Sequence, residues 1–226
     1  MMEGTGMEKQ KYAAIVLAAG SGKRMNSKVH KQYLIIQDRP VLYYSLKAFE
    51  DSAVDEIVLV VGKGEEKFCR KEIVDKYGIS KVKAIVEGGK ERYHSVFEGL
   101  KQTSDADYVL IHDGARPYVS KQSINDLVEC LKTYDAGLLM VPCKDTIKEV
   151  KEGIVVKTLK RETLMQAQTP QVFKSEDIKV AYQKAKDEGY VATDDSQLFE
   201  RYIDKDIKAV LGDYSNLKIT TQEDLK

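Results

Sequence analysis

The stretch that decides the fold is Lys11-Tyr-Ala-Ala-Ile-Val-Leu-Ala-Ala19, which ends at Gly20. After its first residue the run is almost continuously apolar, without the alternation of a strand that faces water on one side. A short run rich in Ile, Val and Leu and closed by glycine is typical of a strand buried on both faces. Because such strands occur in parallel sheets covered by helices, we expect strands and helices to alternate along the chain.

The rest of the chain follows this alternation. Further buried strands are predicted at 57–61, 82–86, 108–111 and 137–141. Helices are predicted at 40–49 with Pro40 as the first helical residue, at 65–77, at 91–101, and up to 131 with Ser120 or Ser123 as the N-cap. This β-α repetition predicts an α/β fold with a doubly wound, mostly parallel sheet.

One segment, 144–159, departs from that pattern. Two short runs of mixed polarity flank Glu152-Gly153, which favours a β-hairpin over a helix. Its apolar residues cannot all reach the core of the parent sheet; they are Ile147, Val150, Ile154, Val156 and Leu159. Helices at 175–188 and 194–202 and strands at 207–211 and 217–220 complete the prediction. We expect a single domain over residues 1–226, with 144–168 as a protruding arm.

The composition limits the classes of partner. The chain has 226 residues, 42% hydrophobic and 32% charged, with 36 basic and 36 acidic residues and a formal net charge of zero. No bulk positive field would hold nucleic acid or an anionic membrane, so an anion site must be local. The longest apolar run is far shorter than the roughly 20 residues of a membrane span, and Met1–Gln10 lacks the apolar stretch of a signal peptide. We therefore expect a cytoplasmic protein.

Cysteine and histidine do not form a metal-binding pattern in this sequence. They occur at Cys69, Cys130 and Cys143 and at His30, His94 and His112, with no CxxC pair and no i, i+4 histidine pair. A zinc site and a disulfide framework are therefore not indicated, and any metal should be bound by oxygen.

The loop that follows the first strand, residues 18–25, is the first candidate site. Its glycines free the backbone to surround an anion with N–H groups, and Lys23 and Arg24 add positive charge. Leu17 and Met25 occupy positions where a Walker loop and a dinucleotide fingerprint, respectively, need glycine. The loop therefore resembles a different phosphate cradle, or a tight turn with solvated basic side chains.

Two more loops follow predicted strands, where open α/β sheets bind ligands. His112-Asp-Gly-Ala-Arg-Pro117 offers a carboxylate and a guanidinium, which could serve a substrate or pair with each other. Glu87-Gly-Gly-Lys-Glu-Arg92, with Ser95, brings paired glycines to a helix start, where free N–H groups attract ligand oxygens. The alternative for this second loop is an ordinary turn.

Taken together and in order, these motifs resemble those of the 2-C-methyl-D-erythritol 4-phosphate cytidylyltransferase family, from about Tyr12 to Leu225. The motifs are Leu17-Ala-Ala-Gly-Ser-Gly-Lys-Arg-Met25, Lys31-Gln-Tyr33, Gly88-Gly89 with Arg92 and Ser95, His112-Asp-Gly-Ala-Arg-Pro117, Gln168-Thr-Pro-Gln171, Thr193-Asp194-Asp195 and Asn216-Leu-Lys-Ile-Thr220. The resemblance implies a Rossmann-like nucleotidyltransferase sheet. It also implies transfer of CMP from CTP to the methylerythritol phosphate, with release of pyrophosphate, in non-mevalonate isoprenoid synthesis.

The resemblance assigns roles to particular residues. It implies CTP binding by Ala18, Ala19, Gly20, Ser21, Gly22, Gly89, Ser95 and Gly114. Arg24 and Lys31 would stabilise charge on the α-phosphorus, and Lys218 would help to place the attacking phosphate. The polyol phosphate would meet Asp113, Arg116 and Thr169, together with Thr146 and Arg161 from an arm that crosses to the partner of a homodimer. Mg²⁺ or Mn²⁺ would be held mainly by the CTP phosphates, with Asp113 as a candidate protein ligand.

Three residues depart from the family pattern. His30 replaces a common proline, Gly114 a common alanine, and Lys90 stands where some members carry an acidic residue. Two alternative functions are kept: a ribitol 5-phosphate cytidylyltransferase, in which valine is more common at the place of Ala115, and a nucleotide-binding regulatory module without turnover. Retention of the four basic residues at 24, 31, 161 and 218 argues against the second.

Overall fold

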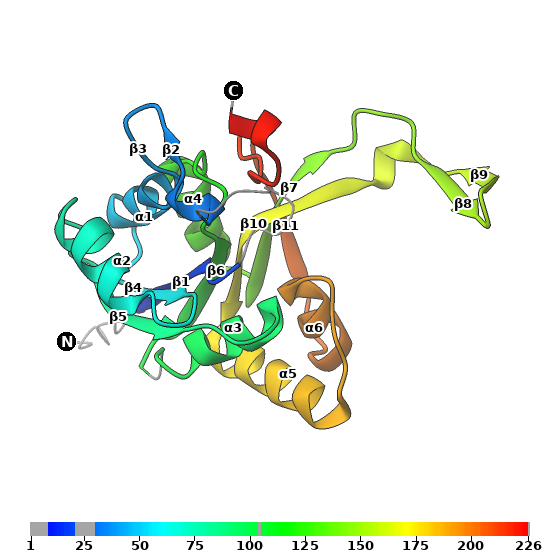
Figure 1. Ribbon diagram of the computed structural model, residues 1–226. Coiled ribbons are helices and arrows are strands. Elements are labelled where there is room, and N and C mark those ends of the chain that lie inside the picture. The colour runs from blue at the N-terminus through cyan, green and yellow to red at the C-terminus, as the bar shows by residue number, and fades with distance from the viewer. Residues whose placement is uncertain (1–8, 21–29, 104, 226) are drawn as a thin grey trace, which may run out of the picture.

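The core of the protein is a seven-stranded sheet flanked by helices (Figure 1). The computed structural model describes residues 9–20, 30–103 and 105–225. The sheet has the strand order β11-β7-β10-β6-β1-β4-β5. Its strands are β1 (Tyr12–Ala18), β4 (Glu56–Val61), β5 (Val82–Glu87), β6 (Tyr108–Asp113), β7 (Ala136–Pro142), β10 (Met165–Lys174) and β11 (Ile207–Leu211). All neighbouring pairs are parallel except those of β10, which confirms the predicted mostly parallel α/β sheet.

Strand β1 lies inside the sheet, parallel to both β4 and β6. Ala14 and Val16 pack in the core on one face, while Ile15 packs in the core on the other. The strand is therefore buried on both faces, as its apolar sequence predicts.

Helices cover both faces of the sheet. One core contains residues of α1 (Val41–Glu50), α2 (Glu66–Cys69) and α4 (Lys121–Cys130). The other contains residues of α3 (Arg92–Leu100), α5 (Ser175–Glu188) and α6 (Asp195–Tyr202). This division between two faces is the doubly wound arrangement.

Local signals place most helix ends, with two differences from the prediction. Ser120 caps α4 by accepting a hydrogen bond from the Ser123 N–H at 3.0 Å. Pro40 is the N-cap of α1 rather than its first residue, and it pairs in the short strand β3 (Arg39–Pro40) with β2 (Ile35–Ile36). The helix predicted at 65–77 is α2 followed by a π-helical turn, η3 (Arg70–Asp75).

The structure differs from the predicted strands in two places: one strand was missed, and one predicted strand is not formed. Strand β10 was not predicted, because its polar residues and Pro170 interrupt the apolar pattern of a buried strand. Conversely, residues 217–220 form no strand; the Ile219 N–H instead donates to the Ala115 carbonyl at 2.8 Å. Both errors occur beside the pocket described below: the pairing of β10 with β7 shifts register between Ala167 and Gln171, and residues 217–220 bond outside any ladder.

The predicted hairpin is present as β8 (Lys148–Lys151) and β9 (Ile154–Thr158), and it extends away from the main sheet (Figure 1). Glu152 and Gly153 form its two-residue turn, with φ of 51° and 80°. Left-handed conformations at both positions suit the twist of a tight hairpin. A short helix, η4 (Arg161–Thr163), connects the arm to β10.

The remaining short helices are η2 (Lys31–Tyr33) and η5 (Gln222–Leu225). Among the described residues, no helix combines the length and the hydropathy that a membrane crossing requires.

Candidate active site

A pocket of about 480 Å³ lies where β1 and β6 end and α3 begins. It is lined by Leu17, Ala18, Ala19, Gly20, Lys31, Gln32, Gly89, Lys90, Glu91, Arg92, Ser95, Asp113, Ala115, Lys218 and Thr220. The carboxyl ends of parallel strands are the usual ligand edge of such a sheet. The pocket therefore brings together two of the loops that the sequence indicated with residues 18–20, the described start of the third.

Gly88 allows two of these loops to approach closely. A Cβ at this position would lie 2.4 Å from the Cβ of Ala19 and 2.6 Å from the Oγ of Ser95. The next residue, Gly89, donates its N–H to Ser95 Oγ at 3.2 Å. Only glycine lets the end of β1 and the start of α3 share one wall of the pocket.

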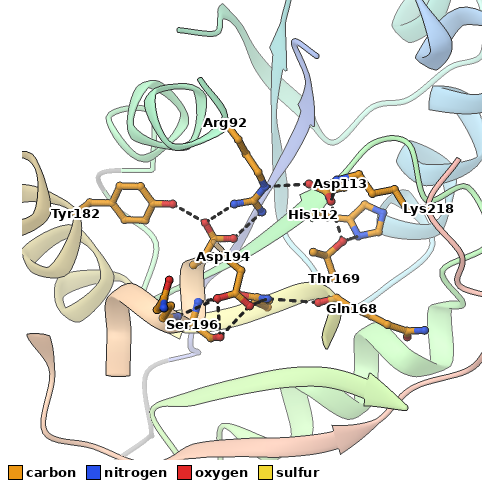
Figure 2. A network of polar contacts seen from close by, with 12 residues as sticks. Arg92, His112, Asp113, Gln168, Thr169, Tyr182, Asp194, Ser196 and Lys218 are labelled. Atoms are coloured by element: carbon orange, nitrogen blue, oxygen red, sulfur yellow. Dashed lines mark hydrogen bonds and ion pairs between the residues drawn. The ribbon is translucent and has the colours of Figure 1, made fainter. Parts of the chain in front are cut away.

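The Asp113 carboxylate lines the pocket and forms ion pairs with two cations, Arg92 and Lys218 (Figure 2). Arg92 Nε donates to its Oδ1 at 3.1 Å, and Lys218 Nζ donates to its Oδ2 at 2.7 Å. Burial by itself would raise the pKa of Asp113, but the charges of Arg92 and Lys218 lower it well below its usual value. Asp113 is therefore ionised throughout the physiological pH range.

Arg92 connects Asp113 to a second carboxylate, that of Asp195. Its Nη1 and Nη2 donate to the two Asp195 oxygens at 2.8 and 2.7 Å. Tyr182 donates its hydroxyl to the same carboxylate. Asp195 is fully buried, and its only signal in the sequence is its place in the Thr193-Asp194-Asp195 motif.

His112 and Thr169 support Asp113 from behind the pocket (Figure 2). His112 Nε2 lies 3.2 Å from the Arg116 carbonyl oxygen, which can only accept, so Nε2 carries the proton. Thr169 therefore donates its hydroxyl to Nδ1, at 3.0 Å, and accepts the Asp113 N–H at 3.1 Å. Burial lowers the pKa of His112 to about 4, so the ring is neutral at pH 7.

The segment 213–220 closes the pocket as an irregular loop. Asn216 donates its side-chain N–H to the Thr169 carbonyl at 2.9 Å, and its own carbonyl accepts from Arg116 Nη1 at 2.7 Å. Lys31 Nζ donates to the Ile219 carbonyl at 3.1 Å. These bonds hold Lys218 over Asp113.

The structure brings together only part of the set of residues that the sequence nominated. The pocket is lined by Ala18, Ala19, Gly20, Lys31, Gly89, Ser95, Asp113 and Lys218. Arg116 and Thr169 lie directly beside it, through the contacts above, and Gly114 packs with its N–H bonded to the Leu17 carbonyl at 2.9 Å. Ser21, Gly22 and Arg24 lie outside the described residues.

Two nominated residues, Thr146 and Arg161, do not line this pocket. Both are exposed and lie in the arm segment, where Arg161 Nη1 donates to the Lys144 carbonyl at 2.7 Å.

Comparison with known proteins identifies the family. The sequence profile of 2-C-methyl-D-erythritol 4-phosphate cytidylyltransferase matches residues 12–226. The chain belongs to this family. A relative of that name from Lachnoclostridium phytofermentans is 46% identical over 96% of this chain and 94% of its own length. One from Lachnospira eligens is 47% identical over 94% of this chain and 95% of its own length.

Solved structures agree with this assignment. The crystal structure of 4-diphosphocytidyl-2C-methyl-D-erythritol synthase from Anaerococcus prevotii has a TM-score of 0.85 and 37% identity, covering 96% of this chain and 93% of that one. Members of this family are nucleotidyltransferases. The ribitol phosphate alternative is not favoured, since the relatives above carry the methylerythritol name.

Two parts of the site have no role that their motifs alone indicate. Arg92 and Asp195 were quoted as motif residues, but their pairing across α3 and α6 became visible only in the fold. Gln171 of β10 is buried and links this strand to α6: it donates to Asp194 Oδ2 and accepts the Ser196 N–H, both at 2.9 Å. The motif Gln168-Thr-Pro-Gln171 was the available signal for this link.

Buried neutral His112 predicts a pH-dependent loss of stability. Its folded-state pKa of about 4 lies below the ordinary value of 6.5, so the unfolded chain binds the proton more readily. The contribution of neutral His112 to the free energy of unfolding is complete above pH 6.5. It is lost as the pH falls towards 4, by about 3 kcal/mol in total. Urea unfolding of the wild type and of His112→Asn between pH 7 and 4 measures this, because asparagine does not titrate. Parallel stability profiles for the two proteins would contradict it.

Proposed function

We propose that the chain transfers CMP from CTP to 2-C-methyl-D-erythritol 4-phosphate and releases pyrophosphate. The observation that carries this proposal is one pocket with a glycine-rich backbone wall and with Lys31, Lys218 and Asp113 on its other sides. The backbone N–H groups of the wall suit a nucleoside triphosphate, and the basic side chains suit the phosphate of a second substrate. The family membership names the two substrates.

The reaction must overcome repulsion between two anions. A phosphate monoester dianion approaches the α-phosphorus of an anionic triphosphate, and unit charges about 4 Å apart repel by about 4 kcal/mol at an effective dielectric constant near 20. Because the nucleophile is already ionised, no covalent intermediate and no strong general base are needed. Neutralisation and alignment are the main tasks of the protein.

We assign the nucleotide to the wall formed by Ala18–Gly20, with Gly89 and Ser95. Ser21 and Gly22, outside the described residues, stay predicted nucleotide contacts. Gly114 supports this wall, since its N–H bonds to the Leu17 carbonyl and a Cβ there would lie 2.9 Å from that oxygen. Lys31, together with Arg24, would stabilise the charge that develops on the α-phosphate during transfer.

We assign the polyol phosphate to the side of the pocket near Asp113 and Lys218. Arg116 and Thr169 lie next to them, and a substrate phosphate would compete with Asp113 for the Lys218 ammonium group. The Asp113 carboxylate is then free to accept a hydroxyl group of the polyol. Lys218 would thereby place the attacking phosphate.

The first test is pyrophosphate release with CTP and either methylerythritol phosphate or ribitol 5-phosphate. We expect turnover with the former, and Lys218→Ala should lower kcat/KM for that substrate by about 100-fold to 1,000-fold while the KM for CTP changes little. Lys121→Ala, at an exposed lysine that begins α4, is the matched control and should behave as wild type. Turnover with ribitol 5-phosphate alone would overturn the assignment, and release with neither would favour the regulatory module.

The metal of this reaction should enter with the nucleotide. Among the described residues, no group of three or more His, Cys, Asp or Glu side chains could hold an ion. Both oxygens of Asp113 face cations, which does not suit it as a resident metal ligand. We therefore propose Mg²⁺ or Mn²⁺ as part of the metal–CTP substrate.

Turnover should accordingly require Mg²⁺ or Mn²⁺, because hard cations prefer phosphate oxygens. The metal concentration that gives half-maximal rate should follow the CTP concentration, and calorimetry should detect no tight Mg²⁺ binding to nucleotide-free protein. Full activity in excess EDTA, or a tight metal site without CTP, would argue against this view.

We also propose a homodimer formed through the arm, residues 144–168. More than half of the surface of four arm side chains is exposed: Val150 (55%), Ile154 (71%), Val155 (59%) and Val156 (54%). An isolated two-stranded hairpin is only marginally stable in water, and a copy of itself across a two-fold axis would bury part of this exposed apolar surface. Arg161 and Thr146 would then complete the pocket of the partner.

The single domain over residues 1–226, the cytoplasmic location and the absence of nucleic-acid or membrane partners stay predictions.

Mixed dimers test the crossing arm. The experiment combines Arg24→Ala subunits with Arg161→Ala subunits, each of which we expect to be nearly inactive alone. If Arg161 acts in trans, one of the two pockets in the heterodimer receives both intact arginines, and pyrophosphate release reappears. If the arm serves its own subunit, both pockets stay defective. Heterodimers as inactive as the parents, after subunit exchange is confirmed by mass spectrometry, would refute the shared site; a monomer in sedimentation would refute the dimer.

A further inference from the structure

The Asp195 carboxylate is fully buried at the start of α6, outside the pocket that it supports. Burying an ionised carboxylate costs several kcal/mol unless it is paired and hydrogen-bonded. Here both oxygens are paired with Arg92, and Tyr182 adds a third donor from α5. Because the buried Asp195 charge is unfavourable by itself and contacts the pocket residue Arg92, we expect its role to lie in that pocket.

Arg92 is the link between this buried carboxylate and the pocket. Its guanidinium group gives both terminal nitrogens to Asp195 and only its Nε to Asp113. Asp113 thereby keeps its second oxygen, Oδ2, for Lys218 at 2.7 Å. The three carboxylate and guanidinium groups come from α3, β6 and α6, which are far apart in the sequence.

Two carboxylates, Asp113 and Asp195, face the cations Arg92 and Lys218, and the charge of Arg116 also acts on Asp113. An arginine fork forms its strongest pair with both oxygens of one carboxylate. Without a negative charge at 195, the nearest carboxylate for Arg92 is Asp113, 3.1 Å from its Nε. A bidentate ion pair between Arg92 and Asp113 would occupy both oxygens of the carboxylate and displace Lys218.

We propose that Asp195 is a positioning residue for the transfer reaction: it keeps Arg92 from forming a bidentate ion pair with Asp113. Asp113 and Lys218 thereby stay aligned for the polyol phosphate. Tyr182 fixes the orientation of the Asp195 carboxylate. This inference rests on the proposed function for its kinetic consequences, but its geometric consequence is independent of turnover.

A double-mutant cycle between Asp195→Asn and Asp113→Asn tests the kinetic consequence. Asp195→Asn alone should lower kcat/KM for the methylerythritol phosphate by about tenfold to 100-fold, the range usual for coupled neighbours. In the Asp113→Asn background the same change should cost less than about threefold, because the group it acts through is gone. The KM for CTP should change by less than about threefold in each case. A merely structural Asp195 would give equal losses in both backgrounds, and that result overturns the proposal.

Two further variants cover the case in which Asp195→Asn does not fold. Arg92→Lys keeps the positive charge but cannot bridge two carboxylates with a fork, so its cycle with Asp113→Asn should show the same loss of additivity. Tyr182→Phe removes only the hydroxyl donor and should produce a smaller loss in the same direction. Additive effects of Arg92→Lys and Asp113→Asn would count against the proposal as strongly as the first cycle.

The crystal structure of Asp195→Asn separates this inference from the proposed function. We expect Arg92 to contact both oxygens of Asp113 and the Lys218 ammonium group to leave that carboxylate. Arg92 and Lys218 at their wild-type positions would overturn the inference even if the enzyme is active. A wild type that releases no pyrophosphate would refute the proposed function, while the crystal structure would still decide the role of Asp195.

Discussion

The ionised Asp113 carboxylate at the end of β6 is the constraint on which the pocket depends. It is buried to 8% exposure, so it needs positive charge from other elements, and Arg92 and Lys218 supply it from opposite directions. Arg92 begins α3, and Lys218 lies in the C-terminal loop, so this single carboxylate ties both to the central strands. Behind it, the Thr169 hydroxyl fixes the Asp113 backbone and the neutral His112 ring.

The antiparallel strand β10 makes this arrangement possible. It runs between β6 and β7 and returns the chain from the arm to the pocket. Thr169 contacts Asp113, while the buried Gln171 fixes the start of α6, where Asp195 lies. One strand thus positions both the support of Asp113 and the counter-charge of Arg92, which explains why its middle residues are polar although buried.

The arm differs from the rest of the structure because its apolar side chains are not buried in a core. Its hairpin satisfies its own backbone hydrogen bonds but leaves Val150, Ile154 and Val156 largely exposed. Two strands have no core of their own and are only marginally stable in water, which is the physical ground for the proposed association through the arm. Arg161 follows the hairpin and does not line the pocket of its own chain in the part of the chain that the structure describes.

The sequence by itself determined the layers of the fold, the arm and the family, because these depend on local properties. A buried parallel strand must be apolar along its length, as 12–18 is, and a tight hairpin needs residues that tolerate left-handed backbone, as Gly153 does. It also located the three loops that line the pocket, since strand ends are recognisable and neighbouring parallel strands end at one edge. What only the tertiary structure decided is the place of β10 within the sheet, the irregular path of 217–220, and the pairing of Arg92 with Asp195. These depend on hydrogen bonds and charges between residues about 100 positions apart in the chain, and no local pattern of hydropathy or turn residues encodes which distant partner will satisfy a buried polar group.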